Sequence, residues 1–119
     1  MAEPKRVLVC GGRNYRDNVR VNQCLNLLHA AFGITVVIHG RASGADMLGE
    51  YWAKANDVPH LAFKPNWEAY GPAAGPMRNK QMLDEGKPDL VIAFPGGKGT
   101  ADMVRQARER GVPVEEITR

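Results

Sequence analysis

The segment Leu90-Val91-Ile92-Ala93-Phe94-Pro95-Gly96-Gly97-Lys98-Gly99-Thr100 gives the clearest indication of the fold. Its first five residues form a continuous apolar run, which is typical of a strand that is buried on both faces. The glycine-rich segment that follows leads into a run with helical spacing, which ends near Gly111. A buried strand, a glycine-rich loop and a helix in this order predict an α/β protein with a parallel sheet.

The same order of strand, loop and helix recurs along the chain. Helical patterns separate the apolar runs, and residues 66–74 are expected to form a loop before a helix that begins at Gly75-Pro76, with the proline in the first helical position. The sequence therefore predicts a single domain, residues 1–119, with an α/β fold. We expect a Rossmann-like three-layer αβα sandwich, with a parallel five-stranded sheet in the order 3-2-1-4-5. The further predicted strands are Val7–Cys10, Ile34–Ile38, Val58–Phe63 and Val114–Ile117.

The composition is that of a globular protein, with 119 residues, 44% hydrophobic and 24% charged. Its net charge of +3 allows an anionic ligand but is too small to indicate nucleic acid binding. No apolar run approaches the roughly 18 residues of a membrane span, and the N-terminus has no signal-peptide pattern, so we expect no membrane partner. Cys10 and Cys24 are interpreted as small buried side chains, which favours a cytoplasmic location.

Three glycine-rich loops follow predicted strands, and the carboxyl ends of parallel strands meet at one edge of the sheet. Glycines let the backbone approach an anion closely, and the helix N-termini at 43–45 and 99–101 add partial positive charge. The loops therefore predict a site for a nucleotide-like small molecule that carries phosphate. The candidate ligand-binding residues lie in these loops or on the helix before the last one: Gly11, Gly12, Arg13, Gly40, Arg41, Ser43, Gly44, Asp46, Arg78, Asn79, Gly96, Gly97, Lys98, Gly99 and Thr100.

Simpler interpretations remain open for single residues of these loops. Ser43 and Asp46 have the spacing of a helix capping box. Lys98 fits a solvated loop tip, and His39 fits a residue packed at a strand end. Trp67 fits either a platform for a base or a cover for the sheet edge.

Several common sites are absent from the sequence. The first strand is not followed by Gly-x-Gly-x-x-Gly, and there is no P-loop, which disfavours ordinary dinucleotide binding and P-loop chemistry. A Gly-x-Ser-x-Gly elbow is missing as well, and no His or Cys residues have the spacing of metal ligands. We therefore expect neither a cofactor nor a metal.

The segment Pro95–Thr100 resembles the Pro-Gly-Gly-x-Gly-Thr motif of the SLOG superfamily. That superfamily includes the Lonely Guy phosphoribohydrolases and the SMF/DprA DNA-processing proteins. Together with Gly40–Asp46, Ala74–Asn79 and Phe94–Met103, the motif resembles the small YspA-like, YpsA-related branch. The resemblance implies a Rossmann-like fold that binds nucleotides or ligands derived from nucleotides.

The sequence departs from the related hydrolases at one position. Their motif continues to a catalytic Glu, which acts with an Arg on the preceding helix. Arg78 matches that Arg in context, but Met103 stands at the position of the Glu. Asp102 is one residue earlier, which is a rotation of about 100° on a helix. If the protein is an enzyme, the resemblance makes Arg78, Asp102 and Asp46 its candidate catalytic residues.

These observations favour a nucleotide-binding protein, of which a sensor is one form. The alternative is a phosphoribohydrolase-like enzyme that cleaves the N-glycosidic bond of a nucleoside monophosphate. Binding of single-stranded DNA is least favoured, because the basic residues form no stripe and no aromatic array accompanies them. Related proteins of the superfamily dimerise through helices beside the sheet, and Tyr51 and Trp52 are adjacent on a predicted helix. We therefore expect a homodimer that buries one of these two side chains.

Overall fold

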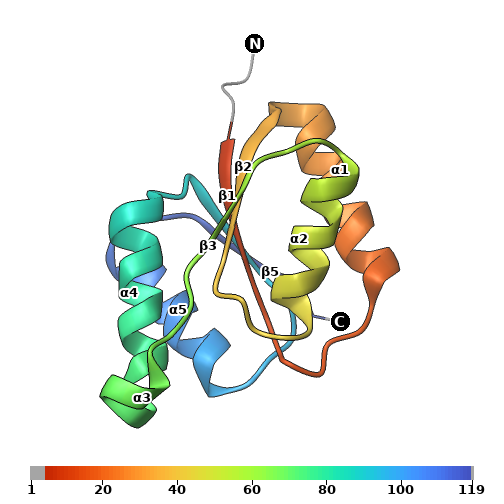
Figure 1. Ribbon diagram of the computed structural model, residues 1–119. Coiled ribbons are helices and arrows are strands. Elements are labelled where there is room, and N and C mark those ends of the chain that lie inside the picture. The colour runs from red at the N-terminus through yellow and green to blue at the C-terminus, as the bar shows by residue number, and fades with distance from the viewer. Residues whose placement is uncertain (1–4, 119) are drawn as a thin grey trace.

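The computed structural model describes residues 5–118, which form a parallel sheet between two layers of helices (Figure 1). The elements alternate along the chain as the sequence predicts. In chain order they are β1 (Lys5–Cys10), α1 (Asn18–Phe32), β2 (Ile34–His39), α2 (Ala45–Ala55), β3 (His60–Ala62), α3 (Trp67–Tyr70), a 3₁₀ turn (Gly71–Ala73), α4 (Ala74–Gly86), β4 (Leu90–Ala93), α5 (Lys98–Glu109) and β5 (Val114–Glu116).

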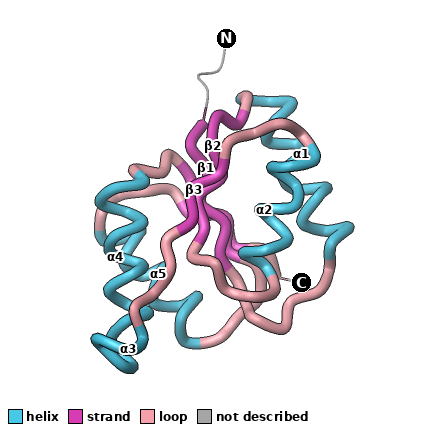
Figure 2. Tube along the Cα trace, viewed as in Figure 1, coloured by secondary structure: helices cyan, strands magenta, loops and turns pink. Residues whose placement is uncertain are grey.

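The sheet has the order β3-β2-β1-β4-β5, and all of its strand pairs are parallel. Strand β1 is central, and its Val7 is aligned with Val37 of β2 and Leu90 of β4. Helices α1 and α2 cover one face of the sheet, and α4 and α5 cover the other (Figure 2). The predicted Rossmann-like αβα sandwich and its strand order are therefore confirmed.

The core consists of two apolar clusters, one on each face of the sheet. Alternate residues of β1 supply them: Val7 and Val9 face α1 and α2, while Leu8 faces α4 and α5. Trp52 lies in the first cluster with 3% of its surface exposed, and its indole N–H donates to Asn26 Oδ1 at 2.8 Å. Trp52 is therefore a core residue, and of the two adjacent side chains Tyr51 is the one available for a dimer contact.

Two predictions about the segment before α4 are wrong. Helix α4 begins at Ala74, so Pro76 is its third residue instead of its first. Proline is tolerated there because the first N–H groups of a helix have no partner within the helix. Residues 66–74 are not a plain loop either, since they contain α3 and the 3₁₀ turn. The Asn66 side chain accepts a hydrogen bond from the Ala69 amide and so caps this short helix.

Among residues 5–118, no helix has both the length and the apolar character needed to cross a membrane.

Candidate functional site

The loops after β1 and β4 and the start of α2 are joined by backbone hydrogen bonds. The Gly12 amide donates to the Pro95 carbonyl at 2.8 Å, and the Ala45 amide donates to the Gly12 carbonyl at 3.2 Å. Gly44 has φ +80°, and a Cβ there would collide with the Gly12 carbonyl. A Cβ at Gly11 would lie 2.6 Å from the Ala45 Cβ. Glycine is therefore required at these positions because the loops pack backbone against backbone.

A cavity of about 560 Å³ opens beside these loops, between the carboxyl end of the sheet and the helices α4 and α5. It has the size of a small-molecule site. Most of the predicted site residues line it, and they come from distant parts of the chain. The predicted residues in its wall are Gly11, Gly12, Arg13, Asp46, Arg78, Asn79, Gly97, Lys98, Gly99, Thr100 and Asp102.

The remaining predicted residues lie next to this cavity. Gly40, Arg41 and Ser43 line a smaller hollow of about 270 Å³, which shares Arg13 and Arg78 with the main cavity. Gly96 packs against Thr100 and the Gly12 amide, so it supports the wall and lies in a separate shallow hollow. Gly44 shapes the backbone contact with the first loop and lines neither hollow.

The N-terminus of α5 opens on the main cavity. Its first residues, Lys98, Gly99 and Thr100, all line the cavity wall. No side chain of residues 5–118 caps this helix end, and its first turn holds no acidic residue. Backbone N–H groups at an uncapped N-terminus and the helix dipole both favour an anion. This end of α5 is therefore the best-suited phosphate position in the cavity.

Arginine side chains add positive charge to the same space. Arg78 of α4 donates from Nη1 to the Gly40 carbonyl and from Nε to Asn79 Oδ1 at 3.2 Å. Within the described residues its Nη2 makes no hydrogen bond and is left for a ligand. The guanidinium carbon of Arg13 lies over the Trp67 ring, 5.7 Å from the ring centroid. Burial lowers the pKa of Arg78, and the nearby charge of Arg13 lowers it further, so an anion between the two would relieve their repulsion.

Asp46 does not form the capping box that its spacing from Ser43 allows. Its Oδ2 accepts hydrogen bonds from the backbone amides of Gly40 at 2.9 Å and Ala42 at 3.3 Å, while the Ser43 hydroxyl donates to the Arg13 carbonyl. Burial raises the pKa of Asp46 to about 6 despite these bonds and the charge of Arg78. Because the carboxylate already occupies two amides of this loop, the loop after β2 is a weaker anion site than the N-terminus of α5.

The first turns of α5 present one carboxylate to the cavity. Asp102 lines it, and its Oδ2 accepts from Asn79 Nδ2 at 3.0 Å and from Gln106 Nε2 at 2.7 Å. Burial raises the pKa of Asp102, but hydrogen bonds from Asn79, Arg105 and Gln106 outweigh it and hold the pKa below its ordinary value. Met103 is fully buried in the apolar cluster on the face of the sheet that α4 and α5 cover. Position 102, and not position 103, therefore faces the cavity.

An apolar wall completes the cavity. Trp67, Pro72, Pro76 and Met82 contribute to it, and Trp67 also borders the smaller hollow. Sequence reasoning left the role of Trp67 open and did not single out the other three. The cluster of proline, glycine and aromatic residues before Arg78 is the sequence signal that could have indicated this wall. The short helix α3, which positions Trp67, was not predicted.

Cys10 also lines the cavity, but its thiol is not a candidate nucleophile. Burial raises its pKa far above the ordinary value, and the charge of Asp46 acts in the same direction. The thiolate is the reactive form of cysteine. Cys10 therefore serves as a small apolar part of the wall.

Comparison with known proteins identifies the family. The sequence model of the YspA, cpYpsA-related SLOG family matches residues 5–70, which include the loops after β1 and β2 and the whole of α3. The chain belongs to this SLOG family. It is also 37% identical over 120 residues to the Gene 61 protein of Mycobacterium phage D29, across 92% of this chain and 94% of that protein.

A solved structure resembles part of the fold. It is the phosphoribosylglycinamide formyltransferase (purN) of Coxiella burnetii in complex with CHES, with 17% sequence identity and a TM-score of 0.48. The similarity covers 82% of the SLOG chain but only 43% of the formyltransferase chain.

Proposed function

We propose that this SLOG protein binds a nucleotide or a nucleotide derivative in the main cavity, with a phosphate group at the N-terminus of α5. The observation that carries the proposal is the shared wall of one cavity, in which the glycine loops after β1 and β4 lie beside Arg78. Family membership supports a ligand-binding role of this general kind. The ligand would bind as a signal or effector, without requiring a reaction.

The cavity supplies both kinds of contact that a nucleotide needs. Lys98, Gly99, Thr100 and the guanidinium of Arg78 suit a phosphate group. At the apolar wall, the exposed ring of Trp67 suits stacking on a base, with 45% of the residue accessible. A volume of about 560 Å³ is in the range of sites that hold a molecule of this size.

Native mass spectrometry of the freshly purified chain tests the proposal, followed by calorimetry with the 5′-monophosphates of adenosine, guanosine, cytidine and uridine. We expect a co-purified nucleotide or binding of at least one of these probes. Trp67→Ala should weaken binding by roughly 1–3 kcal/mol if the ring stacks on the base. Tyr70→Ala is the matched control, because Tyr70 is an equally exposed aromatic residue of α3 that lines neither hollow. Absence of any bound nucleotide and of any binding would contradict the proposal.

A second function is favoured by the position of Asp102. Its carboxylate lies in the cavity wall, is held in its ionised form and shares Asn79 with the side chain of Arg78. A carboxylate at this place is the group that an N-glycosidic hydrolase needs to orient water or to offset positive charge on the ribose. Three hydrogen bonds hold Asp102 in place, which favours a structural role and makes hydrolysis the second candidate.

A further inference from the structure

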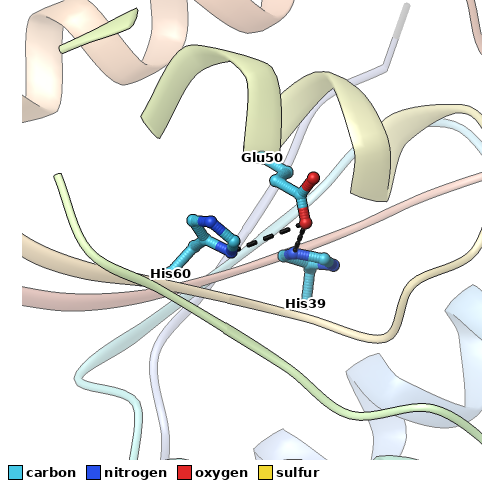
Figure 3. Close-up of side chains that lie close together, drawn as sticks. All are labelled: His39, Glu50 and His60. Carbon is cyan, nitrogen blue, oxygen red and sulfur yellow. Dashed lines mark ion pairs between the residues drawn. The ribbon is translucent and has the colours of Figure 1, made fainter. Parts of the chain in front are cut away.

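Three metal-binding side chains converge on the other side of β2 from the main cavity. His39 ends β2, Glu50 lies on α2 and His60 begins β3 (Figure 3). Glu50 Oε1 is 3.0 Å from His39 Nε2 and 3.5 Å from His60 Nδ1, and the three atoms all lie within 4.8 Å of one another. Ligand atoms about 2.1 Å from a tetrahedral zinc ion lie roughly 3.4 Å apart, and Glu50 Oε1 lies at about this distance from both histidine nitrogens.

Outside this cluster, the three converging atoms have no hydrogen-bond partner among the described residues, and within it the histidine nitrogens contact only Glu50 Oε1. These atoms, His39 Nε2, Glu50 Oε1 and His60 Nδ1, are all buried. His39 is completely buried, and Glu50 is 4% exposed. Buried polar atoms are normally satisfied, and one ion among these three atoms would satisfy all of them together. We propose that His39, Glu50 and His60 bind a divalent transition-metal ion, with zinc as the best fit.

The chemistry of the three side chains suits this role. Two imidazoles and one carboxylate are a ligand set that zinc accepts, with water in the fourth position.

The neighbouring groups define what must change when the ion binds. Lys54 Nζ pairs with the second carboxylate oxygen, Oε2, at 3.0 Å, so Oε1 remains available to the metal. The Arg41 amide donates to His39 Nδ1 at 3.1 Å, so the proton of the neutral ring is on Nε2. Metal binding at Nε2 moves that proton to Nδ1, where it faces the Arg41 amide hydrogen. The Arg41 peptide must then turn away, which predicts a large change in its amide NMR signal.

The ion would join three elements of the sheet edge. Strand β3 has three residues and lies at the edge of the sheet beside β2, and its His60 would be tied to α2 through the metal. The sequence gives no sign of such a site, because the three residues are separated by 10 positions or more and come from three elements. The expected consequence is a zinc-dependent rise in the thermal midpoint, since a ligand that binds the folded state stabilises it.

Calorimetry with zinc chloride tests the proposal. The full chain is first dialysed against a chelator, and the chelator is then removed by dialysis. We expect one ion per chain, and an affinity at least about tenfold weaker in His60→Gln. Loss of a residue that only hydrogen-bonds to a metal ligand already weakens metal binding by about this factor, and loss of a ligand should weaken it at least as much. His60 is partly exposed, so its replacement should leave the fold intact, as circular dichroism can verify. His29→Gln is the matched control, because His29 lies outside the cluster and packs against Trp52.

Two readouts complete the test. Cobalt chloride should give the visible absorption bands of a tetrahedral site in the wild type and in His29→Gln, but not in His60→Gln. Zinc should also shift the Arg41 amide signal in the wild type and in His29→Gln, but not in His60→Gln. No binding of zinc to the wild type, or equal affinity in the two variants, would overturn the proposal.

Discussion

The geometry of the main cavity gives a quantitative prediction of how Arg78→Ala changes ligand affinity. The guanidinium uses Nη1 and Nε on Gly40 and Asn79, which leaves Nη2 to meet a phosphate. A charge-assisted hydrogen bond of this kind contributes about 1.5–3 kcal/mol, so the variant should bind a nucleoside monophosphate roughly 10- to 100-fold more weakly. Isothermal titration calorimetry of both proteins, with the monophosphate that the wild type binds, measures the difference directly.

The same substitution has a predictable effect on stability. Loss of the hydrogen bond to the Gly40 carbonyl should cost about 1 kcal/mol, which lowers the thermal midpoint by roughly 3–6 °C for a chain of this size. Arg108→Ala is the control, since Arg108 pairs with Glu116 near the far end of α5 and lines neither hollow. Affinity that is unchanged in Arg78→Ala, or equally reduced in Arg108→Ala, would refute the assignment of Arg78 to the phosphate.

Further predictions concern carboxylates, Met103 and the surface of α2. The pKa of Asp46 is raised from 3.8 to about 6, so the stability contributed by its neutral form is present below about pH 4 and is lost as the pH rises through 6. The free energy of unfolding of Asp46→Asn, measured with urea, should lack this part of the pH dependence. A pH profile identical to that of the wild type would contradict the prediction. We expect little or no release of free base from nucleoside monophosphates, and Asp102→Asn should abolish any residual turnover; robust turnover that survives this change would exclude Asp102 as the catalytic group. Because Met103 is in the core, Met103→Glu should not create activity and should lower the free energy of unfolding by about 3 kcal/mol or more, so a stable, active variant would contradict the structure. Tyr51 is 56% exposed on α2, and Tyr51→Glu should convert the expected homodimer to a monomer in light scattering; a wild-type monomer at micromolar concentration would remove this expectation.

The architecture was predictable from the sequence because strands buried on both faces leave continuous apolar runs. Val7–Cys10 and Leu90–Phe94 have no alternation of polar and apolar residues, and each leads into a glycine-rich loop. The parallel order then places these loops at one edge, so their meeting follows from the topology. The short helix α3 was missed because its four residues depend on the Asn66 cap, which gives no periodic pattern.

The details of the site were less predictable, since they depend on where side chains point. The Ser43–Asp46 spacing fits a capping box equally well, and only the path of the loop shows that Asp46 accepts from Gly40 and Ala42 instead. Likewise, the sequence cannot decide between positions 102 and 103 of α5. The packing of Met103 into the core under α4 fixes the rotation of the helix and turns Asp102 toward the cavity.

A ¹H–¹⁵N NMR titration of the full chain with a nucleoside monophosphate shows whether a phosphate binds at the N-terminus of α5, the position on which the proposed function depends. Phosphate oxygens that accept from backbone N–H groups shift those amide signals. We expect saturable shifts at Lys98, Gly99 and Thr100, with smaller effects at Gly12, whose amide donates to Pro95, and at Gly40 and Ala42, whose amides are held by Asp46. Shifts confined to residues outside the cavity wall, or no shifts at millimolar nucleotide, would contradict binding at this position.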